Sequence, residues 1–312
     1  MFKIKKNGIY RARLVGLGYS QVPGVDFSEN FSPVINDVTF RTLLALMLAR
    51  GWKGKLIDVE TAFLYGDLEE EVYMKCPEGL EEFDGTDPEE TCVLLEKSIY
   101  GLVQAARNWW KKFMKTLTND LGFVKTSADS CLLKRENENG TVILCIYVDD
   151  VCCVGDEAAI DEAIAEIEKI YTIKKLGEMK EYVRVTVERT GDQTMWLSQP
   201  DTLEKMEENF ERFVKDMKVF SAPAAQGSAV IRSKSEEGKL KADEQKLYRS
   251  GVGMLLWLTK HSRPDLSNAV REASKVMDGA TQEHLKYLLR IVKYALDTKK
   301  HKLLFNCKAT GD

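Results

Sequence analysis

The sequence lacks several patterns that mark common classes of protein. It has three histidines, spread over positions 261, 284 and 301, and none of its seven cysteines forms a C-x-x-C pair, which argues against a structural zinc site. No apolar run approaches ~18 residues, so no transmembrane helix is expected. The N-terminus, Met1 to Lys6, lacks the apolar core of a signal peptide. Gly16 and Gly18 do not form a dinucleotide fingerprint, because Gln21 occupies the third glycine position.

The composition describes a soluble globular protein. Apolar residues make up 44% and charged residues 30% of the 312 positions, and this length allows more than one lobe with its own core. The cysteines are odd in number and several lie in apolar, strand-like runs. We therefore expect buried free thiols in a reducing compartment.

The net charge of −4 is unevenly distributed. Residues 67–90 hold eleven acids and one lysine, a charge of −10, so the rest of the chain carries +6. Basic residues recur near the C-terminus, at Lys286, Arg290, Lys293, Lys299, Lys300 and Lys302. A basic stripe beside an acidic projection fits a nucleic-acid-binding cleft. Ordinary charge patches on a soluble protein explain the same distribution equally well.

The segment Ile146–Asp150 places two adjacent carboxylates, Asp149 and Asp150, between two apolar β-prone runs. Such runs joined by a short polar step predict a β-hairpin with both acids at its tip. Close like charges repel, and a divalent cation is their natural partner. An ordinary polar turn is the alternative, because Asp is a common turn residue.

A third acid, Asp58, lies inside another short apolar segment, Lys55–Val59. One Asp on a strand together with an Asp pair on a hairpin is the carboxylate set of a two-metal phosphoryl or nucleotidyl transfer site. Magnesium suits such a site because it takes few protein ligands and shares the rest with phosphates and water.

Two motifs resemble the reverse transcriptase of Ty1/copia-type LTR retrotransposons. They are Tyr147-Val148-Asp149-Asp150 and the run Asp58-Val59-Glu60-Thr61-Ala62-Phe63-Leu64-Tyr65-Gly66. Further blocks follow the order of that family and together cover nearly the whole chain: residues 10–15, 24–34, 71–75, 97–104, 248–250 and 263–265.

The resemblance implies an α+β fold of the right-hand polymerase type, with fingers, a palm with an antiparallel sheet and the YVDD hairpin, and a helical thumb. The expected divisions are 1–53 (first part of the fingers), 54–66 (palm strand with the first catalytic Asp), 67–98 (second, acidic part of the fingers), 99–197 (palm), 198–246 (palm–thumb linker region) and 247–312 (helical thumb or connection). RNase H, integrase and protease domains are expected to be absent from this chain.

The resemblance also assigns site residues. Asp58, Asp149 and Asp150 are the expected catalytic carboxylates, and with the Val59 carbonyl they would hold two Mg²⁺ ions, with Mn²⁺ as an alternative. The expected nucleotide-binding residues are Arg11, Arg13, Phe63, Tyr100, Gly101 and Gln104, of which Phe63 would exclude a ribose 2′-OH. The expected primer- and template-binding residues are Tyr147, Val148, Val183 and Arg184.

Four positions in three segments depart from the family pattern. Arg184 stands where the family usually has Gly beside the primer 3′ end. Gly16-Leu17-Gly18 replaces the usual Ala-Arg-Gly and removes a cation from the fingers, and Val103 replaces a common Lys. Because of these departures, a second interpretation stays open: a catalytically weakened or inactive fragment that binds primer–template without extending it. A cyclase-like palm acting on free nucleotides is a third interpretation, which Phe63 and the helical C-terminal third oppose.

The leading interpretation is an RNA-directed DNA polymerase that joins dNTPs to a primer 3′-OH on an RNA or DNA template. Its expected partners are an RNA template, a DNA or tRNA primer, dNTPs and the rest of the retrotransposon polyprotein, including RNase H and integrase, with no membrane. The expected localisation is intracellular and cytoplasmic, within virus-like particles.

Apolar spacing predicts the secondary structure around these motifs. Helices are expected at 39–50, 104–121, 248–260, 264–278 and 281–297, with a further helix whose apolar face is Ile160, Ile164 and Ile167. Strands are expected at 182–187 and 195–197, and a linker at 221–246. Trp109 and Trp110 are expected to serve the core of the 104–121 helix, with template stacking as the alternative.

Overall fold

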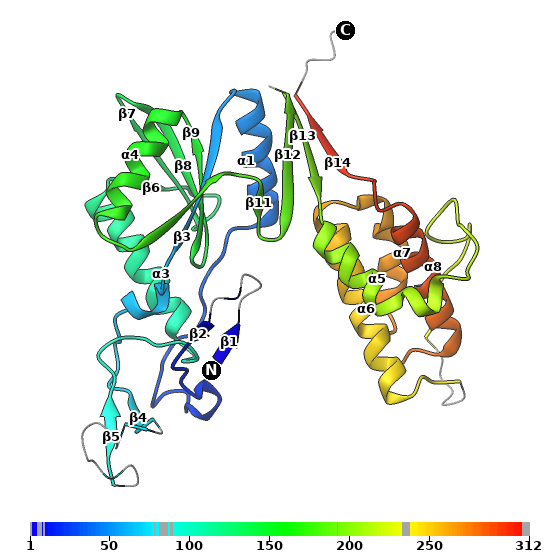
Figure 1. Cartoon of the computed structure of the whole chain (residues 1–312), viewed down its shortest axis with the longest axis horizontal. Coiled ribbons are helices and arrows are strands. Elements are labelled where there is room, and N and C mark those ends of the chain that lie inside the picture. Colours follow the sequence, from blue (N-terminus) through cyan, green and yellow to red (C-terminus); the bar gives the residue numbers. More distant parts are fainter. Residues whose placement is uncertain are drawn as a thin grey trace. The chain divides into compact units, whose positions relative to one another are not determined.

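The computed structural model describes residues 2–4, 8, 10–77, 79–80, 87, 90–191, 193–232 and 238–307 (Figure 1). The chain divides into two compact units, and each is described by itself. Unit 1 comprises Met1–Met47 and Trp52–Met179; unit 2 comprises Leu48–Gly51 and Lys180–Asp312. Both contain helices and antiparallel sheets, so the predicted mixture of helix and antiparallel strand is confirmed.

Unit 1 is built on a six-stranded antiparallel sheet with the strand order β10-β3-β9-β8-β7-β6. Its strands are β3 (Lys53–Val59), β6 (Val124–Lys125), β7 (Leu132–Asn137), β8 (Gly140–Tyr147), β9 (Asp150–Gly155) and β10 (Ile173–Glu178). Residues 142–146 and 151–155 are buried because β8 and β9 are almost wholly apolar and lie centrally in the sheet. The hairpin expected around Asp149 is therefore present as β8 and β9.

Three longer helices accompany this sheet: α1 (Asp37–Ala49), α3 (Ala105–Lys115) and α4 (Glu157–Glu168). The predicted face of α4 is buried against β8, β9 and β3. The helix predicted at 104–121 is α3 followed by one π-helical turn, η3 (Thr116–Asp120). The short elements of unit 1 are β1 (Phe2–Ile4), β2 (Tyr10–Ala12), η1 (Gly18–Ser20), η2 (Ala62–Tyr65), β4 (Tyr73–Lys75) and β5 (Cys92–Leu94).

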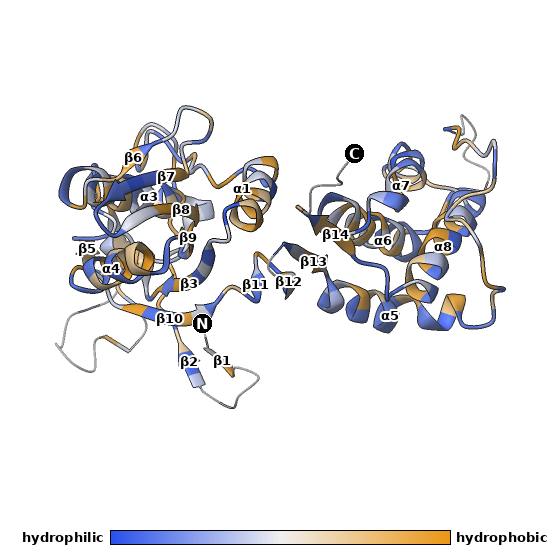
Figure 2. Cartoon of the chain, turned by 90° about the horizontal axis from the view of Figure 1, so that it is seen from above, coloured by the Kyte–Doolittle hydropathy of each residue, from blue (hydrophilic) through white to orange (hydrophobic). Residues whose placement is uncertain are grey.

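Unit 2 combines a four-stranded antiparallel sheet, ordered β11-β12-β13-β14, with a group of helices. The strands are β11 (Glu181–Tyr182), β12 (Val185–Gly191), β13 (Thr194–Ser198) and β14 (Leu303–Asn306). The helices are α5 (Pro200–Val214), α6 (Ala242–His261), η4 (Pro264–Leu266), α7 (Ser267–Ser274) and α8 (Gln282–Asp297). Apolar residues of these helices, orange in Figure 2, form one core centred on side chains such as Phe210, Tyr248 and Leu288.

The Arg263–Asp265 block has a structural role within unit 2. Arg263 is 1% exposed and its guanidinium donates to the Asp265 carboxylate at 2.8 and 2.9 Å and to the Thr298 hydroxyl at 2.7 Å. Burial acts to raise the pKa of Asp265, but the hydrogen bonds and charge of Arg263 outweigh it and hold that pKa below its ordinary value. The block therefore ties the start of α7 to the end of α8.

Two expectations about unit 2 need correction. The single strand predicted at 182–187 is a hairpin, because the chain reverses at Val183 and Arg184 and Tyr182 pairs with Val185. Apolar alternation continues through the turn and so could not reveal it. The linker expected at 221–246 ends earlier, because helix α6 begins at Ala242. Helix α5 was not predicted, although Leu203, Met206, Phe210 and Val214 are spaced to form a buried helical face.

The cysteine prediction is confirmed for four residues, because Cys131, Cys145, Cys152 and Cys153 are buried free thiols. Cys76 and Cys307 are half-buried and Cys92 is exposed, also as free thiols. Within the described part of the chain, no helix combines the length and apolarity that crossing a bilayer requires.

The basic stripe expected near the C-terminus is partly neutralised. Lys293 pairs with Asp297 at 2.8 Å, Lys299 with Glu207 at 3.2 Å, and Lys302 with Glu188 at 2.6 Å. Three of the six cations named from the sequence thus have acidic partners within unit 2, so charge counting overstated the basic surface.

Candidate active site

The two carboxylates Asp58 and Asp150 lie opposite each other on adjacent strands. β3 pairs with β9 in antiparallel register, with Asp58 against Asp150, and the Val59 amide donates to the Asp149 carbonyl at 2.9 Å. Directly opposed residues project from the same face of a sheet with Cβ atoms about 4.5–5.5 Å apart. Pairing of segments some ninety residues apart therefore brings the predicted catalytic acids together.

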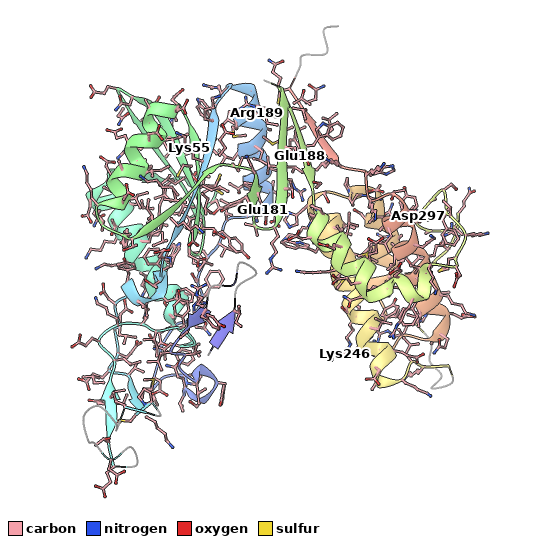
Figure 3. The ribbon with its side chains drawn as sticks, viewed as in Figure 1. Lys55, Glu181, Glu188, Arg189, Lys246 and Asp297 are labelled. Carbon is pink, nitrogen blue, oxygen red and sulfur yellow. The ribbon has the colours of Figure 1, made fainter. Side chains whose placement is uncertain are left out.

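The face that carries these acids is the one away from α4. Lys55 of β3, which is labelled in Figure 3, pairs with Asp161 at 2.6 Å and with Glu157 at 3.3 Å, both on α4. Because side chains alternate along a strand, Asp58 points to the opposite face. Asp58, Asp149 and Asp150 are all half-buried.

The electrostatics of Asp58 show how close these charges are. Burial, followed by the charges of Asp149 and Glu60, raises the pKa of Asp58, while Lys174 and Arg11 act to lower it. Lys174 lies opposite Asp58 on β10. The net upward shift means that the local cations do not fully offset the burial and the acidic neighbours. A bound cation would relieve this repulsion.

The donor set fits a hard divalent ion. Among the described residues, no group of three or more His, Cys, Asp or Glu side chains has the spacing of a metal site. Magnesium is nevertheless commonly bound through one or two carboxylates, with water and substrate phosphates completing its shell. The interacting carboxylates of Asp58 and Asp149 are of that kind.

The turn that presents Asp149 has an unfavourable backbone. Tyr147 pairs with Asp150, so Val148 and Asp149 form a two-residue turn, and Val148 has a φ of 60°. A β-branched residue with positive φ is a genuine outlier, and such strain costs on the order of 1–3 kcal/mol. The surrounding structure must therefore hold this turn in place.

Three of the predicted nucleotide-binding side chains lie together. The ring centroids of Phe63 and Tyr100 are 5.0 Å apart, and the Arg13 guanidinium carbon lies 4.1 Å from the Tyr100 ring centroid. All three are half-buried. Arg11 belongs with the carboxylates, because its charge acts on the pKa of Asp58. Arg13 and the aromatic pair thus form one group, and Arg11 is the predicted nucleotide-binding cation whose charge acts on Asp58.

Gly101 and Gln104 serve to attach segment 16–26 to the start of α3. Gly101 has a φ of 93°, and a Cβ on it would lie 2.1 Å from the Gly16 carbonyl oxygen, so no other residue fits without a shift. Gln104 is 1% exposed; its amide donates to the Asp26 carbonyl at 3.0 Å and accepts from Gln21 at 3.1 Å. The Gln104 side chain is thus engaged within the protein, and its predicted nucleotide contact stays a prediction.

The same packing accounts for Gly18, which the family shares, but not for the departures at Gly16 and Leu17. A Cβ on Gly18 would lie 2.1 Å from the Gly101 carbonyl oxygen, so Gly is required there. At Gly16 a Cβ would lie 3.1 Å from a Leu102 methyl group, a contact that a small adjustment could accommodate. Nothing in these contacts requires Leu17 in place of the usual Arg.

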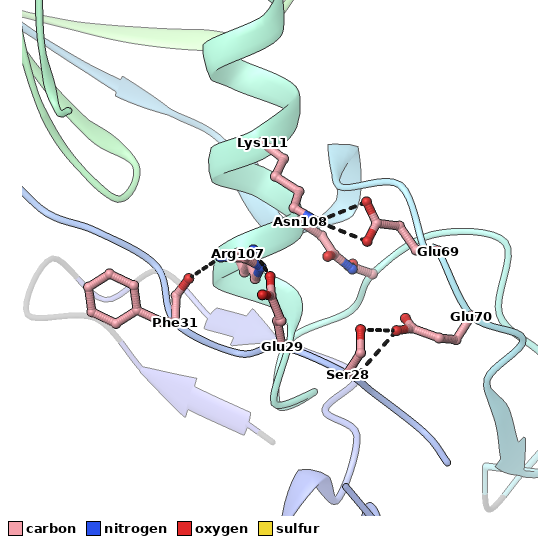
Figure 4. A network of polar contacts seen from close by, with 9 residues as sticks. Ser28, Glu29, Phe31, Glu69, Glu70, Arg107, Asn108 and Lys111 are labelled. Carbon is pink, nitrogen blue, oxygen red and sulfur yellow. Dashed lines mark hydrogen bonds and ion pairs between the residues drawn. The ribbon is translucent and has the colours of Figure 1, made fainter. Parts of the chain in front are cut away.

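A polar network attaches two further segments to α3 (Figure 4). Arg107 pairs with Glu29 and donates to the Phe31 carbonyl at 2.9 Å, and Lys111 contacts both carboxylate oxygens of Glu69 at 2.8 and 2.9 Å. Ser28 donates its hydroxyl to Glu70 at 2.8 Å. These contacts link residues 28–31 with 69–70 around one helix. They join positions far apart in the chain and could not be read from local sequence.

A sequence model of the reverse transcriptase (RNA-dependent DNA polymerase) family matches residues 1–222. The chain belongs to this family. Every residue predicted for the site lies within the matched range, from Arg11 to Arg184.

Similar proteins are the Pol polyproteins of transposons. The chain is 36% identical to the retrovirus-related Pol polyprotein from transposon TNT 1-94 of Nicotiana tabacum, over 98% of this chain and 23% of that protein. It is 32% identical to the corresponding polyprotein from transposon RE1 of Arabidopsis thaliana, over 94% of this chain and 19% of that protein. The transposon Ty1-DR5 Gag-Pol polyprotein of Saccharomyces cerevisiae is 30% identical over 57% of this chain and 10% of that protein. The chain thus spans less than a quarter of these relatives.

The family's expected primer-contacting pair, Val183 and Arg184, lies in unit 2. The two residues form the turn between β11 and β12, with φ values of 49° and 59°. Turns of this kind favour Asn and Gly, because both central residues need positive φ. The usual family Gly at position 184 therefore has a backbone reason, and Arg184 occupies a strained conformation with an exposed side chain.

Sequence reasoning missed a contact that supports the Val148–Asp149 turn of this reverse transcriptase family member. Trp109 is 1% exposed, which confirms its expected place in the core, but its indole N–H also donates to the Val148 carbonyl at 2.8 Å. A buried Trp needs an acceptor for its single N–H. The sequence could therefore have indicated that Trp109 donates a hydrogen bond, but not that the Val148 carbonyl accepts it.

Proposed function

We propose that this chain is the polymerase module of a copia-type retrotransposon, an RNA-directed DNA polymerase that extends a primer on an RNA or DNA template. The observation that carries the proposal is the register of β3 against β9, which sets Asp58 opposite Asp150 while the charge of Asp149 acts on Asp58. Family membership supports the class of reaction, and the arrangement of these carboxylates supports the position of the site.

Unit 1 would serve as the catalytic part. Its six-stranded sheet corresponds to the palm in this proposal, with segments 1–53 and 67–98 as fingers. The palm range 99–197 extends beyond unit 1, because residues from Lys180 onward belong to unit 2. The helices of unit 2 would include the thumb, with 198–246 leading to it and 247–312 forming it. Each unit has its own buried core, as such a division requires.

Asp58, Asp149 and Asp150 would organise the metal ions, with the Val59 carbonyl as a further ligand. When bound, two Mg²⁺ ions, or Mn²⁺ in their place, would offset the negative charge of the primer oxygen and of the pyrophosphate leaving group. The protein's own contribution is to hold Asp58 and Asp150 on one sheet face and to keep that face free of α4.

Arg11 and Arg13 would bind the triphosphate, since a guanidinium presents a fixed fork of donors to phosphate oxygens. Phe63, supported by Tyr100 at 5.0 Å between ring centroids, would lie beneath the sugar and exclude a 2′-OH. Gly101 would allow the backbone to approach the nucleotide. Tyr147, Val148, Val183 and Arg184 would contact primer or template.

The expected partners are an RNA template, a DNA or tRNA primer and dNTPs. The similar Pol polyproteins support linkage to further retrotransposon domains, of which RNase H and integrase are proposed here. Cytoplasmic virus-like particles are the proposed location, with no membrane involved.

Primer extension tests the proposal. The purified chain should extend an annealed DNA primer on an RNA template when Mg²⁺ and dNTPs are present, and should form no cyclic product from free nucleotides. Binding of the same duplex without extension would support the second candidate, a weakened fragment. The observation favouring that candidate is the strained Val183–Arg184 turn, which carries a cation where the family usually has Gly.

A further inference from the structure

Trp109 lies directly beneath the turn that presents Asp149. Its indole Nε1 donates to the Val148 carbonyl at 2.8 Å, and the Val59 amide donates to the Asp149 carbonyl at 2.9 Å. These two carbonyls belong to the peptide units immediately before and after the Asp149 Cα. Asp149 is therefore held on both sides, once by a side chain of α3 and once by the strand that carries Asp58.

The Val148 peptide needs such an anchor. Val148 has a φ of 60°, which β-branched residues rarely adopt, so rotation about its N–Cα bond toward negative φ would relieve strain. Because the Val148 carbonyl lies on the far side of that bond, the same rotation would move it away from the buried indole N–H. The hydrogen bond thus opposes a movement that would also turn the Asp149 side chain.

The Trp109 ring itself is held by neighbouring aromatic rings. It stacks on Phe113 with 4.8 Å between centroids and an 18° interplanar angle, and it meets Tyr171 edge-on at 5.3 Å. Tyr65 lies 6.1 Å away and accepts a hydrogen bond from the Thr172 amide at 3.1 Å. The ring is 1% exposed and cannot change direction without repacking this cluster.

A glycine of the Asp58 motif allows α3 to come this close. A Cβ on Gly66 would lie 2.9 Å from the Trp109 backbone nitrogen and 3.1 Å from the Asn108 Cβ. Two conditions therefore bring the indole to the turn: Gly66 permits the helix to approach, and the aromatic cluster fixes the ring.

We infer that Trp109 is a positioning residue for the reaction: its indole N–H fixes the Val148–Asp149 peptide and so directs the Asp149 carboxylate toward Asp58. The inference rests on the proposed polymerase function and deepens it. Trp109 touches neither substrate nor metal in this account and acts only through Asp149.

The direct test replaces Trp109 in the full chain by 3-benzothienylalanine, which keeps the bicyclic ring but has sulfur in place of the N–H. Because a misplacement of about 1 Å can cost about 10²-fold in rate, we expect the maximal single-turnover extension rate to fall by about 10- to 100-fold. The Mg²⁺ concentration for half-maximal rate should rise. Duplex affinity should hold, since it comes mainly from phosphate contacts.

The matched control is the same replacement at Trp110, the next residue of α3. Its ring lies beneath the Lys125 ammonium, 5.1 Å from the ring centroid, and not at the Val148 carbonyl. This variant should keep the wild-type rate and Mg²⁺ dependence. Replacing Trp109 by 4-fluorotryptophan, which retains the N–H, should restore both.

Two further measurements do not depend on catalysis, and the first of them needs only the wild-type chain. In the ¹⁵N-labelled wild-type chain, the Trp109 indole proton should exchange slowly with solvent, and Mg²⁺ should raise the melting temperature of the wild type more than that of the Trp109 isostere. A rapidly exchanging indole proton, or equal rates and equal Mg²⁺ responses in the two proteins, would overturn the inference. If the wild type extends no primer, the proposed function fails, whereas loss of the Mg²⁺ response in the isostere would still support the role of Trp109.

Discussion

Burial and neighbouring acids disfavour the ionised form of Asp58 in the folded protein. Its raised pKa means that the folded protein binds the proton more tightly than the unfolded chain. Its contribution to stability is therefore present below the unfolded pKa and is lost as the pH rises through the folded pKa. At neutral pH the ionised group destabilises the metal-free fold, as expected of a carboxylate arranged for ligands and not for the fold.

Changing Asp58 to Asn should stabilise the metal-free protein at pH 7, by roughly 1–3 °C because the group is half-exposed and partly screened. The gain should shrink toward pH 3, where the wild-type carboxyl is protonated, and Mg²⁺ should stabilise the wild type but not the variant. Thermal melts over this pH range measure both effects. The exposed Asp120→Asn change is the control, and a variant that melts lower than the wild type at pH 7 without metal would contradict the assignment.

Phe63 offers a second prediction about a single side chain. Its ring rests on Tyr100 in a half-buried position, so Phe63→Val should open space beside the sugar without disturbing base pairing. Discrimination against ribonucleotides should fall by on the order of 1–3 kcal/mol, the scale of other pocket-size effects. Steady-state incorporation of dNTP and rNTP by the two proteins measures it. If an active variant discriminates between dNTP and rNTP as well as the wild type does, Phe63 serves only in packing.

The β11–β12 hairpin illustrates how an element can limit activity. Its turn places Val183 and Arg184 at positive φ, a conformation that costs non-glycine residues roughly 1–2 kcal/mol each. Both residues are also predicted to approach the primer. Backbone strain and a long cation therefore occur at the same position.

Arg184→Gly should raise the melting temperature and speed primer extension at least several-fold, mainly in the chemical step. The reasons are relief of positive-φ strain and removal of a side chain that displaces the primer 3′-OH. Single-turnover extension and duplex affinity should be measured together, with Arg189→Gly on β12 as the control that gains neither. A slower, more weakly binding and less salt-sensitive Gly variant would instead identify Arg184 as a phosphate clamp.

The elements differ in how far sequence could predict them. Apolar runs and helical spacing were sufficient for β8, β9, α1, α4 and α8, because burial dictates those patterns. The Val183–Arg184 turn was not predicted, because it lacks the Asn or Gly that normally marks such turns. Helix α5 was not predicted, although the spacing of Leu203, Met206, Phe210 and Val214 shows a helical apolar face.

At the scale of the molecule, the acids were predictable and their arrangement was not. The motifs identified Asp58, Asp149 and Asp150, but the register that opposes Asp58 and Asp150 joins distant segments and depends on the complete sheet. The anchoring of Val148 by Trp109 depends on the same long-range packing. The charge pattern overstated the basic surface for a related reason, since Lys299 and Lys302 pair with acids that lie far away in the sequence. The Lys293–Asp297 pair, four residues apart on α8, could have been read from helical spacing.

In the proposed mechanism the carboxylates and the rest of the chain have separate functions. Asp149 organises metal ions in this account, while duplex affinity comes from contacts with the phosphate backbone elsewhere. Asp149→Asn keeps the size and the backbone of the turn residue and removes its charge. The comparison therefore separates catalysis from binding within one folded protein.

The most direct measurement is Mg²⁺-dependent primer extension by the wild type and by Asp149→Asn, made alongside the affinity of each protein for the same RNA–DNA duplex. The account predicts that extension is abolished in the variant and that its duplex affinity stays within about twofold of the wild type. A variant that extends primers at nearly the wild-type rate would contradict the assignment of the metal site.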